Sequence, residues 1–278
     1  MRTAAGPWVV LDTALAFWYV QMHSSDMNTG ITAKRLFLRG AFVVALVATA
    51  VAAESASPST AVTPKRPNIV IILGDDLGFA DMGAFGSEIK TPNLDSLAKA
   101  GVRFTHFYTH ASCSPTRSML LSGVDTHRNG LGNMDEWTAP NQMGKPGYEG
   151  YLNDRVATLP QLLKDAGYHT YMAGKWHMGK KPDQIPAARG FERDFTLLDG
   201  AGSYWDMANF TAATPKSTFT EDGRYLKRLP KDYYATKTYT DKIISYIEAN
   251  RGDGKPFFAY VSHQAPHEPY HSRGQTIT

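Results

Sequence analysis

The stretch Asn68-Ile69-Val70-Ile71-Ile72-Leu73-Gly74-Asp75-Asp76 decides the fold class, because an unbroken apolar run ends in a glycine and two carboxylates. A strand that is apolar on both sides is typical of a parallel sheet covered by helices on both faces. We therefore predict a strand over 68–73. Adjacent side chains of a strand point to opposite sides, but a bend permitted by Gly74 would bring Asp75 and Asp76 together.

The pattern after this stretch alternates between short apolar runs and helical spacing, which predicts an α/β fold. The expected sheet is mixed and mainly parallel. One helix is expected after the cap residue Thr91, from Pro92 up to Gly101. Two more helices are expected over 158–166 and over 236–250. Further strands are expected over 102–108, 168–173 and 256–262, and an aromatic-rich irregular segment over 182–232.

Composition excludes some functions. The 278 residues are 42% apolar, which is enough for one sizeable core or two small ones. The formal charge is only +3 and the basic residues are scattered, so nothing indicates a nucleic-acid partner. Cys113 is the single cysteine, so no intrachain disulfide can form. It is a buried inert thiol, a group with a chemical role or a site of pairing between chains.

The N-terminal region reads as a targeting segment. Three basic residues precede an apolar run over 40–53 that ends in small residues, which is typical of a signal peptide. We predict that the signal peptide is 27–53, that 1–26 is a mis-called upstream extension and that 54–67 is a flexible linker to a domain over 68–278. The apolar run is shorter than the ~20 residues of a membrane-spanning helix. The expected location is therefore periplasmic or secreted, without a permanent membrane anchor.

Polar clusters follow several predicted strands, where ligands gather in open α/β sheets. Asp75 and Asp76 offer oxygen ligands, which suit calcium or magnesium better than zinc. A pair of acids at an ordinary turn is the plain alternative.

The segment Cys113-Ser114-Pro115-Thr116-Arg117 is the second cluster. If Pro115 opens a helix, Cys113 lies at its amino end, where free N–H groups favour an anion. Arg117 lies four residues on and can share that face of the helix. A buried cysteine before an ordinary helix is the alternative reading.

Two further clusters contain histidine. Lys175 and His177 fall on one side of an extended chain and could bind an oxyanion and donate a proton, or could be a surface lysine and a structural histidine. His263 and His267 follow the last predicted strand, and one of them is expected to face the site.

These clusters, in this order, resemble the sulfatase family, specifically the bacterial-type arylsulfatases, over residues 67–271. Residues 113–117 match the family's Cys-x-Pro-x-Arg motif, which directs oxidation of the cysteine to formylglycine. Residues 167–177, from Gly167-Tyr168-His169-Thr170 to Gly174-Lys175-Trp176-His177, match its second signature.

The resemblance implies an alkaline-phosphatase-like fold and a role for each matching position. Asp75 and Asp76 would bind a metal, calcium above all, beside the modified Cys113. Cys113 would be the nucleophile as an aldehyde hydrate, made by a formylglycine-generating or sulfatase-maturing enzyme. Arg117 would stabilise the hydrate, Lys175 would bind sulfate, His177 would contact the hydrate, and His267 matches the sulfate-side histidine better than His263.

The implied function is hydrolysis of small sulfate monoesters. A phosphonate or phosphate ester hydrolase of the same superfamily and an inactive truncated remnant are the alternatives. Family members continue past this point, so we expect a fold that is incomplete at the C-terminus, with an exposed sheet edge, a tendency to aggregate and a weak or absent metal site.

Overall fold

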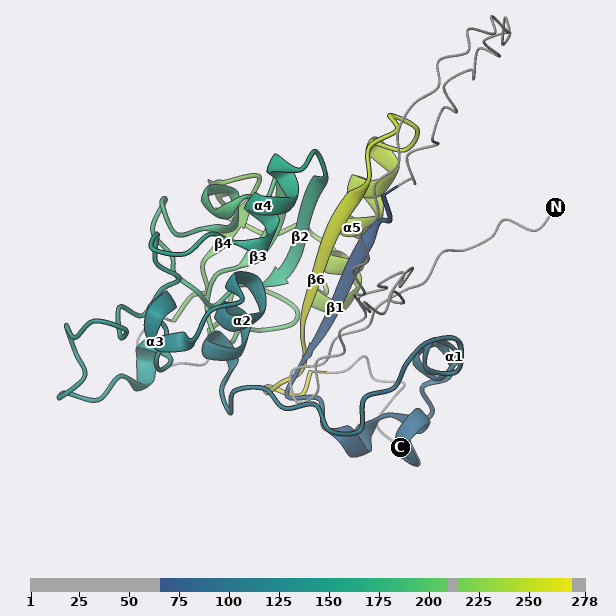
Figure 1. The fold of residues 1–278 in the computed structure, drawn as a ribbon, viewed down its shortest axis with the longest axis horizontal. Coiled ribbons are helices and arrows are strands. Elements are labelled where there is room, and N and C mark those ends of the chain that lie inside the picture. The colour runs from purple at the N-terminus through teal and green to yellow at the C-terminus, as the bar shows by residue number, and fades with distance from the viewer. Residues whose placement is uncertain (1–65, 210–214, 272–278) are drawn as a thin grey trace, which may run out of the picture. The chain divides into compact units, whose positions relative to one another are not determined.

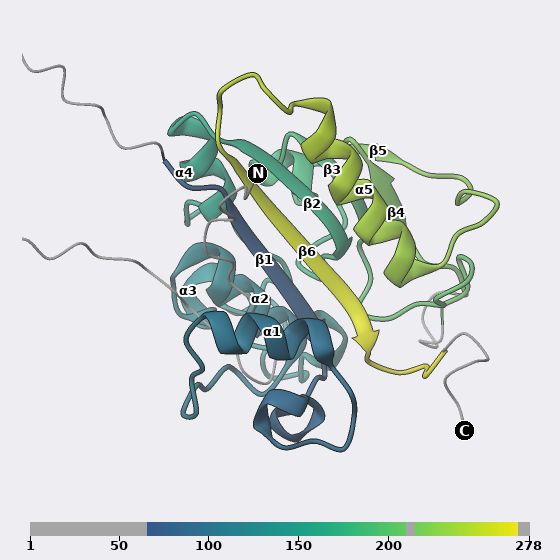
Figure 2. The same cartoon turned by 90° about the vertical axis from the view of Figure 1, so that its right-hand side faces the viewer.

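The computed structural model describes residues 66–209 and 215–271, which form a sheet with helices on both faces (Figures 1 and 2). The predicted signal peptide over 27–53, the extension over 1–26 and nearly all of the linker over 54–67 lie outside the described residues. Within the described residues, no helix is both long and apolar enough to cross a bilayer.

The six strands lie in the order β1-β6-β2-β3-β4-β5. Strands β1, β6, β2 and β3 run parallel to one another, whereas β4 pairs antiparallel with β3 and β5 pairs antiparallel with β4. Their bounds are β1 Ile69–Asp75, β2 His169–Lys175, β3 Arg193–Leu197, β4 Phe219–Glu221, β5 Arg224–Tyr225 and β6 Phe257–Pro266. The mixed, mainly parallel sheet is thus confirmed.

The helices cover both faces of this sheet. Their bounds are α1 Pro92–Ala100, α2 Cys113–Ser122, α3 Thr126–Asn129, α4 Leu159–Asp165 and α5 Ala235–Ala249. Short 3₁₀ helices are η1 Phe79–Asp81, η2 Gly83–Phe85, η3 Asp135–Trp137 and η4 Pro186–Arg189. The sequence predicts α1, α4 and α5 from capping and spacing. It predicts α2 on the condition that Pro115 opens a helix, and α2 begins two residues earlier, at Cys113.

Alternation along the strands separates two cores. Leu73 and Tyr260 face one side, where Leu121 of α2 packs with the partly buried Leu163 of α4. Tyr171, Ala173 and Val261 face the other side and pack against α5. Burial on both faces explains why β1 and the first half of β6 are nearly continuous apolar runs.

Two expectations about local structure were wrong. Residues 102–108 form no strand, and Val102 and Tyr108 are 55% and 83% exposed. Alternating apolar residues do not make a strand without a neighbour to pair with, and β1 pairs with β6 alone among the described residues. The segment over 182–232 is not wholly irregular, since it contains β3, β4 and β5.

Candidate active site

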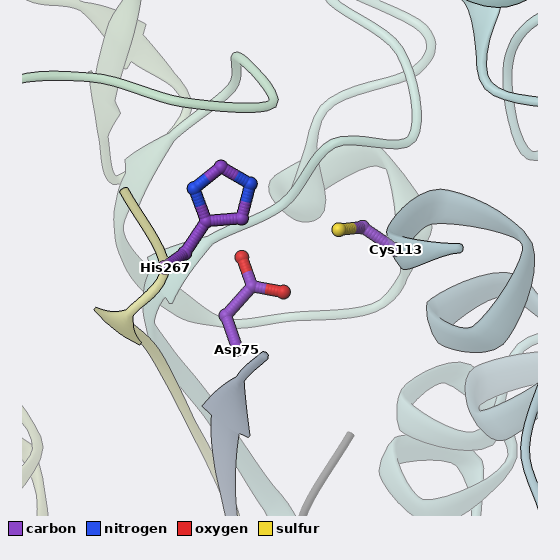
Figure 3. A group of neighbouring side chains, drawn as sticks. All are labelled: Asp75, Cys113 and His267. Atoms are coloured by element: carbon purple, nitrogen blue, oxygen red, sulfur yellow. The ribbon is translucent and has the colours of Figure 1, made fainter. Parts of the chain in front are cut away.

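The predicted site residues meet at the carboxyl ends of the parallel strands. Asp75 ends β1, Lys175 ends β2, and His267 directly follows β6. Because β1 and β6 are parallel, with Asp75 in register with Pro266, their ends deliver these side chains to one edge of the sheet. Cys113 is the first residue of α2, so the helix brings its amino end to the same place (Figure 3).

Asp75, Cys113 and His267 point toward one another in Figure 3. One potential ligand atom from each of the three lies within 4.8 Å of the others. Asp75 is fully buried, whereas Cys113 and His267 are partly exposed, so the group opens toward solvent on the cysteine and histidine side.

Asp76 takes a different position from its neighbour. Its backbone has φ 63, in the left-handed region, and this reversal turns its carboxylate away from the strand direction. A non-glycine residue in this region costs about 1–2 kcal/mol. The Asp76 Oδ2 atom lies 3.7 Å from His267 Nε2. Asp76 therefore approaches His267, one of the three residues described above. Its side chain is more exposed than that of Asp75.

Arg117 is fully buried and ties α2 to the sheet. Its Nη1 atom donates to the Lys175 carbonyl oxygen at 3.0 Å and to Ser262 Oγ, while Nη2 lies 3.3 Å from Asp75 Oδ1. Burial lowers the pKa of the Arg117 guanidinium, but the attractions of Asp75, Tyr260 and Cys113 together outweigh it and the net shift is upward. Arg117 and Cys113 belong to the same helix, and the guanidinium reaches the Asp75 carboxylate at the end of β1.

Lys175 is also fully buried, and its Nζ atom donates to Asp75 Oδ2. Burial raises the pKa of the Asp75 carboxyl, but Lys175 and Arg117 together outweigh that cost and hold the pKa well below its usual range. One buried carboxylate therefore faces two buried cations. The resulting excess of positive charge favours an anion at this position.

Gly174 makes the close approach of β2 and β6 possible. Its φ is +121, and a Cβ atom there would lie 1.8 Å from the Ser262 carbonyl oxygen. The Ser262 hydroxyl in turn donates to the Lys175 carbonyl oxygen at 2.8 Å. Gly174 thus lets β6 approach closely, and Ser262 of β6 holds the Lys175 backbone through a hydrogen bond. Sequence reasoning missed this support because it depends on the packing between the two strands.

An extended chain would have placed His177 on the same side as Lys175, but the backbone at His177 is not extended. Its backbone has φ 57, and its Nε2 atom lies 2.9 Å from Glu136 Oε1. His263 packs near the Tyr239 ring of α5, so His267 is the histidine of that segment that reaches Asp75 and Asp76.

The donor set fits a hard divalent cation. The Asp75 Oδ1 atom is buried and accepts no hydrogen bond from the residues that the structure describes, although it lies 3.3 Å from Arg117 Nη2. Asp75 and Asp76 supply oxygen, and position 113 would supply oxygen after its conversion to a hydrated aldehyde. Such an ion would neutralise negative charge that develops on an ester oxygen.

Comparisons with known proteins identify the family. The sulfatase pattern matches residues 67–277. The chain belongs to the sulfatase family. It is 47% identical over 223 residues to an uncharacterized sulfatase of Schizosaccharomyces pombe. That alignment covers 77% of this chain and 40% of the relative. It is 38% identical over 238 residues to the arylsulfatase of Klebsiella aerogenes, covering 83% of this chain and 49% of the relative.

Solved sulfatase structures agree with this assignment. The crystal structure of Ps i-CgsB superposes with a TM-score of 0.64 at 28% identity, over 76% of this chain and 47% of that one. A protein solved with its substrate D-glucosamine-2-N,6-O-disulfate superposes with a TM-score of 0.55 at 33% identity, over 73% and 35% of the two chains. The alkaline-phosphatase-like fold is thereby confirmed. The chain spans about half the length, or less, of the relatives it matches.

Proposed function

We propose that this protein hydrolyses sulfate monoesters, using a formylglycine made from Cys113 and a divalent cation, calcium in the first place, held by Asp75 and Asp76. The observation that carries the proposal is the buried arrangement in which Arg117 and Lys175 share one carboxylate directly beside Cys113. Such a site stabilises an anion. A sulfate monoester is an anion with enough oxygen atoms to interact with both Arg117 and Lys175.

The chain's own residues would divide the work. A maturing enzyme uses an external two-electron oxidant to convert the Cys113 side chain to an aldehyde, with the sulfur lost as sulfide and the oxygen gained in its place. The aldehyde takes up water and becomes a hydrate with two hydroxyl groups. One hydroxyl oxygen attacks sulfur, and the bond from sulfur to the alcohol oxygen breaks as that alcohol leaves with a proton. His267 is placed to interact with the sulfuryl side of the substrate, and His177 with the hydrate.

The second hydroxyl explains how the enzyme is restored. Loss of its proton drives formation of the carbon–oxygen double bond and expels sulfate from the same carbon. Water then hydrates the aldehyde again, so no water attack at sulfur is needed. The cation supplies charge neutralisation when bound, and Arg117 and Lys175 keep the reacting oxygens in place.

The substrate belongs to the small sulfate esters. Relatives include an arylsulfatase and the N-acetylgalactosamine-6-sulfatase of the dog, which is 32% identical over 230 residues. We propose export to the periplasm or the outside as the setting, on the basis of the basic and apolar pattern over 27–53.

The test is turnover by the purified chain after co-expression with a maturing enzyme. Aryl sulfate is the first substrate, and aryl phosphonate and aryl phosphate are compared in parallel. Mass spectrometry of the peptide that holds position 113 shows whether the thiol became an aldehyde. Metal-dependent release of sulfate that disappears in Cys113→Ala supports the proposal. A matured chain that cleaves only the phosphonate or phosphate ester contradicts it.

A further inference from the structure

We propose that Glu136 is a positioning residue for His177, holding the imidazole by Nε2 and leaving Nδ1 as the ring nitrogen available to the reacting group. The inference rests on the proposed sulfate ester hydrolysis and adds a residue from the segment between α3 and α4. Glu136 lies in η3, 41 positions before His177 in the chain.

The two ring nitrogens of His177 have different surroundings. Nε2 lies 2.9 Å from Glu136 Oε1. Nδ1 is buried and has no hydrogen-bond partner among the residues that the structure describes. A buried imidazole nitrogen without a partner is costly, so Nδ1 is a position that a water molecule or a bound ligand would satisfy. An ionised carboxylate can only accept a hydrogen bond, so this contact favours the neutral ring with its proton on Nε2 and its lone pair on Nδ1.

The surroundings hold the His177 ring in one place. The backbone at His177 has φ 57, in the left-handed region that a non-glycine residue seldom adopts. The ring lies against Gly200, where a Cβ atom would be 2.6 Å from both Cε1 and Nε2. The same Cβ atom would be 2.8 Å from Glu136 Oε1. The pair therefore occupies a space that only a glycine at position 200 leaves open.

The electrostatics agree with an ionised acceptor. Burial raises the pKa of Glu136, but the hydrogen bond and the charge interaction with His177 outweigh it and lower the pKa to about 2. Lys175 lowers it further, which also places Glu136 within electrostatic reach of the buried cations. A carboxylate that stays charged at every working pH makes a stronger and more directional hydrogen bond than a neutral group.

A purely structural role is the alternative, because the Glu136 side chain is 41% exposed and such pairs contribute little to stability. The two roles differ in what they control. A structural contact changes the stability of the fold, whereas a positioning contact changes the tautomer of His177 and the rate of the chemical step.

The experiment records side-chain ¹⁵N signals of the full 278-residue chain labelled in histidine, at a pH high enough to keep imidazoles neutral. The His177 signals are assigned by their loss in His177→Gln. In the unmodified sequence we expect the tautomer protonated at Nε2. In Glu136→Ala we expect a mixture of tautomers, and in Glu136→Gln, which keeps a neutral acceptor, an intermediate result. Glu248→Ala, an exposed acid of α5, is the matched control and leaves the His177 signals unchanged.

Turnover supplies the second readout. If the chain hydrolyses aryl sulfate, Glu136→Gln lowers kcat by about 10–100-fold, as loss of a group that orients an active residue does, with KM nearly unchanged. His177 signals that are identical in Glu136→Ala and in the unmodified chain overturn the inference, whatever the turnover. A chain that shows the tautomer change but hydrolyses no ester contradicts the proposed function and leaves the positioning role supported.

Discussion

Lys175 and Asp75, which are 100 positions apart in the chain, form an ion pair in which both side chains are fully buried. Arg117 approaches the other oxygen of the same carboxylate at 3.3 Å. A buried ion pair does not by itself make a protein more stable, because the cost of removing charges from water can match the attraction. Removal of one partner is different, since the remaining buried charges lose their balance.

Lys175→Met is therefore expected to destabilise the protein by about 3 kcal/mol, toward the lower end of the range for broken buried pairs because Arg117 still pairs with Asp75. The measurement is the free energy of unfolding in urea, followed by circular dichroism. The matched control is Lys237→Met, which breaks an exposed pair with Asp241 and costs less than about 1 kcal/mol. Equal decreases in the free energy of unfolding in the two variants would show that the buried pair contributes no more to stability than the exposed pair.

His169 predicts a pH dependence at the opposite end of β2. Its Nδ1 atom lies 2.8 Å from Glu192 and its Nε2 atom 2.6 Å from Asp253. Burial lowers the pKa of His169, but hydrogen bonds to both carboxylates outweigh it and the net shift is upward from 6.5. Above pH 6.5 the folded chain thus keeps a proton that the unfolded chain has lost. This contribution to stability is complete below the unfolded pKa and is lost as the pH rises through the folded pKa.

The check compares urea midpoints across that pH range in the unmodified chain and in His169→Gln. The difference between the two is expected to shrink as the pH rises. His127→Gln, at a histidine whose side chain is 56% exposed, is the control and should follow the unmodified chain. A difference that stays constant with pH would contradict the role of His169.

The main strands of the sheet and most of the site residues could be predicted from the sequence, for a physical reason. β1 and β6 are buried on both faces, so their apolar runs are long and easy to recognise. Cys113 and Arg117 are one helical turn apart, so their common face follows from local geometry.

The missed features depend on tertiary contacts. β3 is short and begins with two charged residues, Arg193 and Asp194, and β4 has three residues, so neither has a clear pattern. The strand expected over 102–108 had the right alternation but no partner. Glu136 is an ordinary acid in a segment without periodicity, and only the fold brings it to His177.

Gly200→Ala tests the space around His177. The added Cβ atom would overlap both His177 and Glu136, and the exposed Glu136 side chain is the one able to move. We expect a modest loss of stability of about 1 kcal/mol together with a change in the His177 ¹⁵N signals. Gly101→Ala, where the nearest atom is the Leu97 carbonyl oxygen at 3.2 Å, is the control. Unchanged His177 signals in Gly200→Ala would show that the ring is not confined there.

Cys113→Ser separates the hydrate mechanism from simple attack by an alcohol. A serine hydroxyl that attacks sulfur leaves a sulfate ester on a carbon that carries no second hydroxyl, so nothing can expel the sulfate from that carbon. We expect one release of alcohol per protein molecule at most and a sulfuryl group on the peptide that contains position 113. Intact and peptide mass spectrometry after incubation with aryl sulfate measures both. Cys113→Ala, which has no nucleophile, should acquire no sulfuryl group. Repeated turnover by Cys113→Ser would contradict the mechanism, because it would mean that water or another residue releases the sulfate without the second hydroxyl.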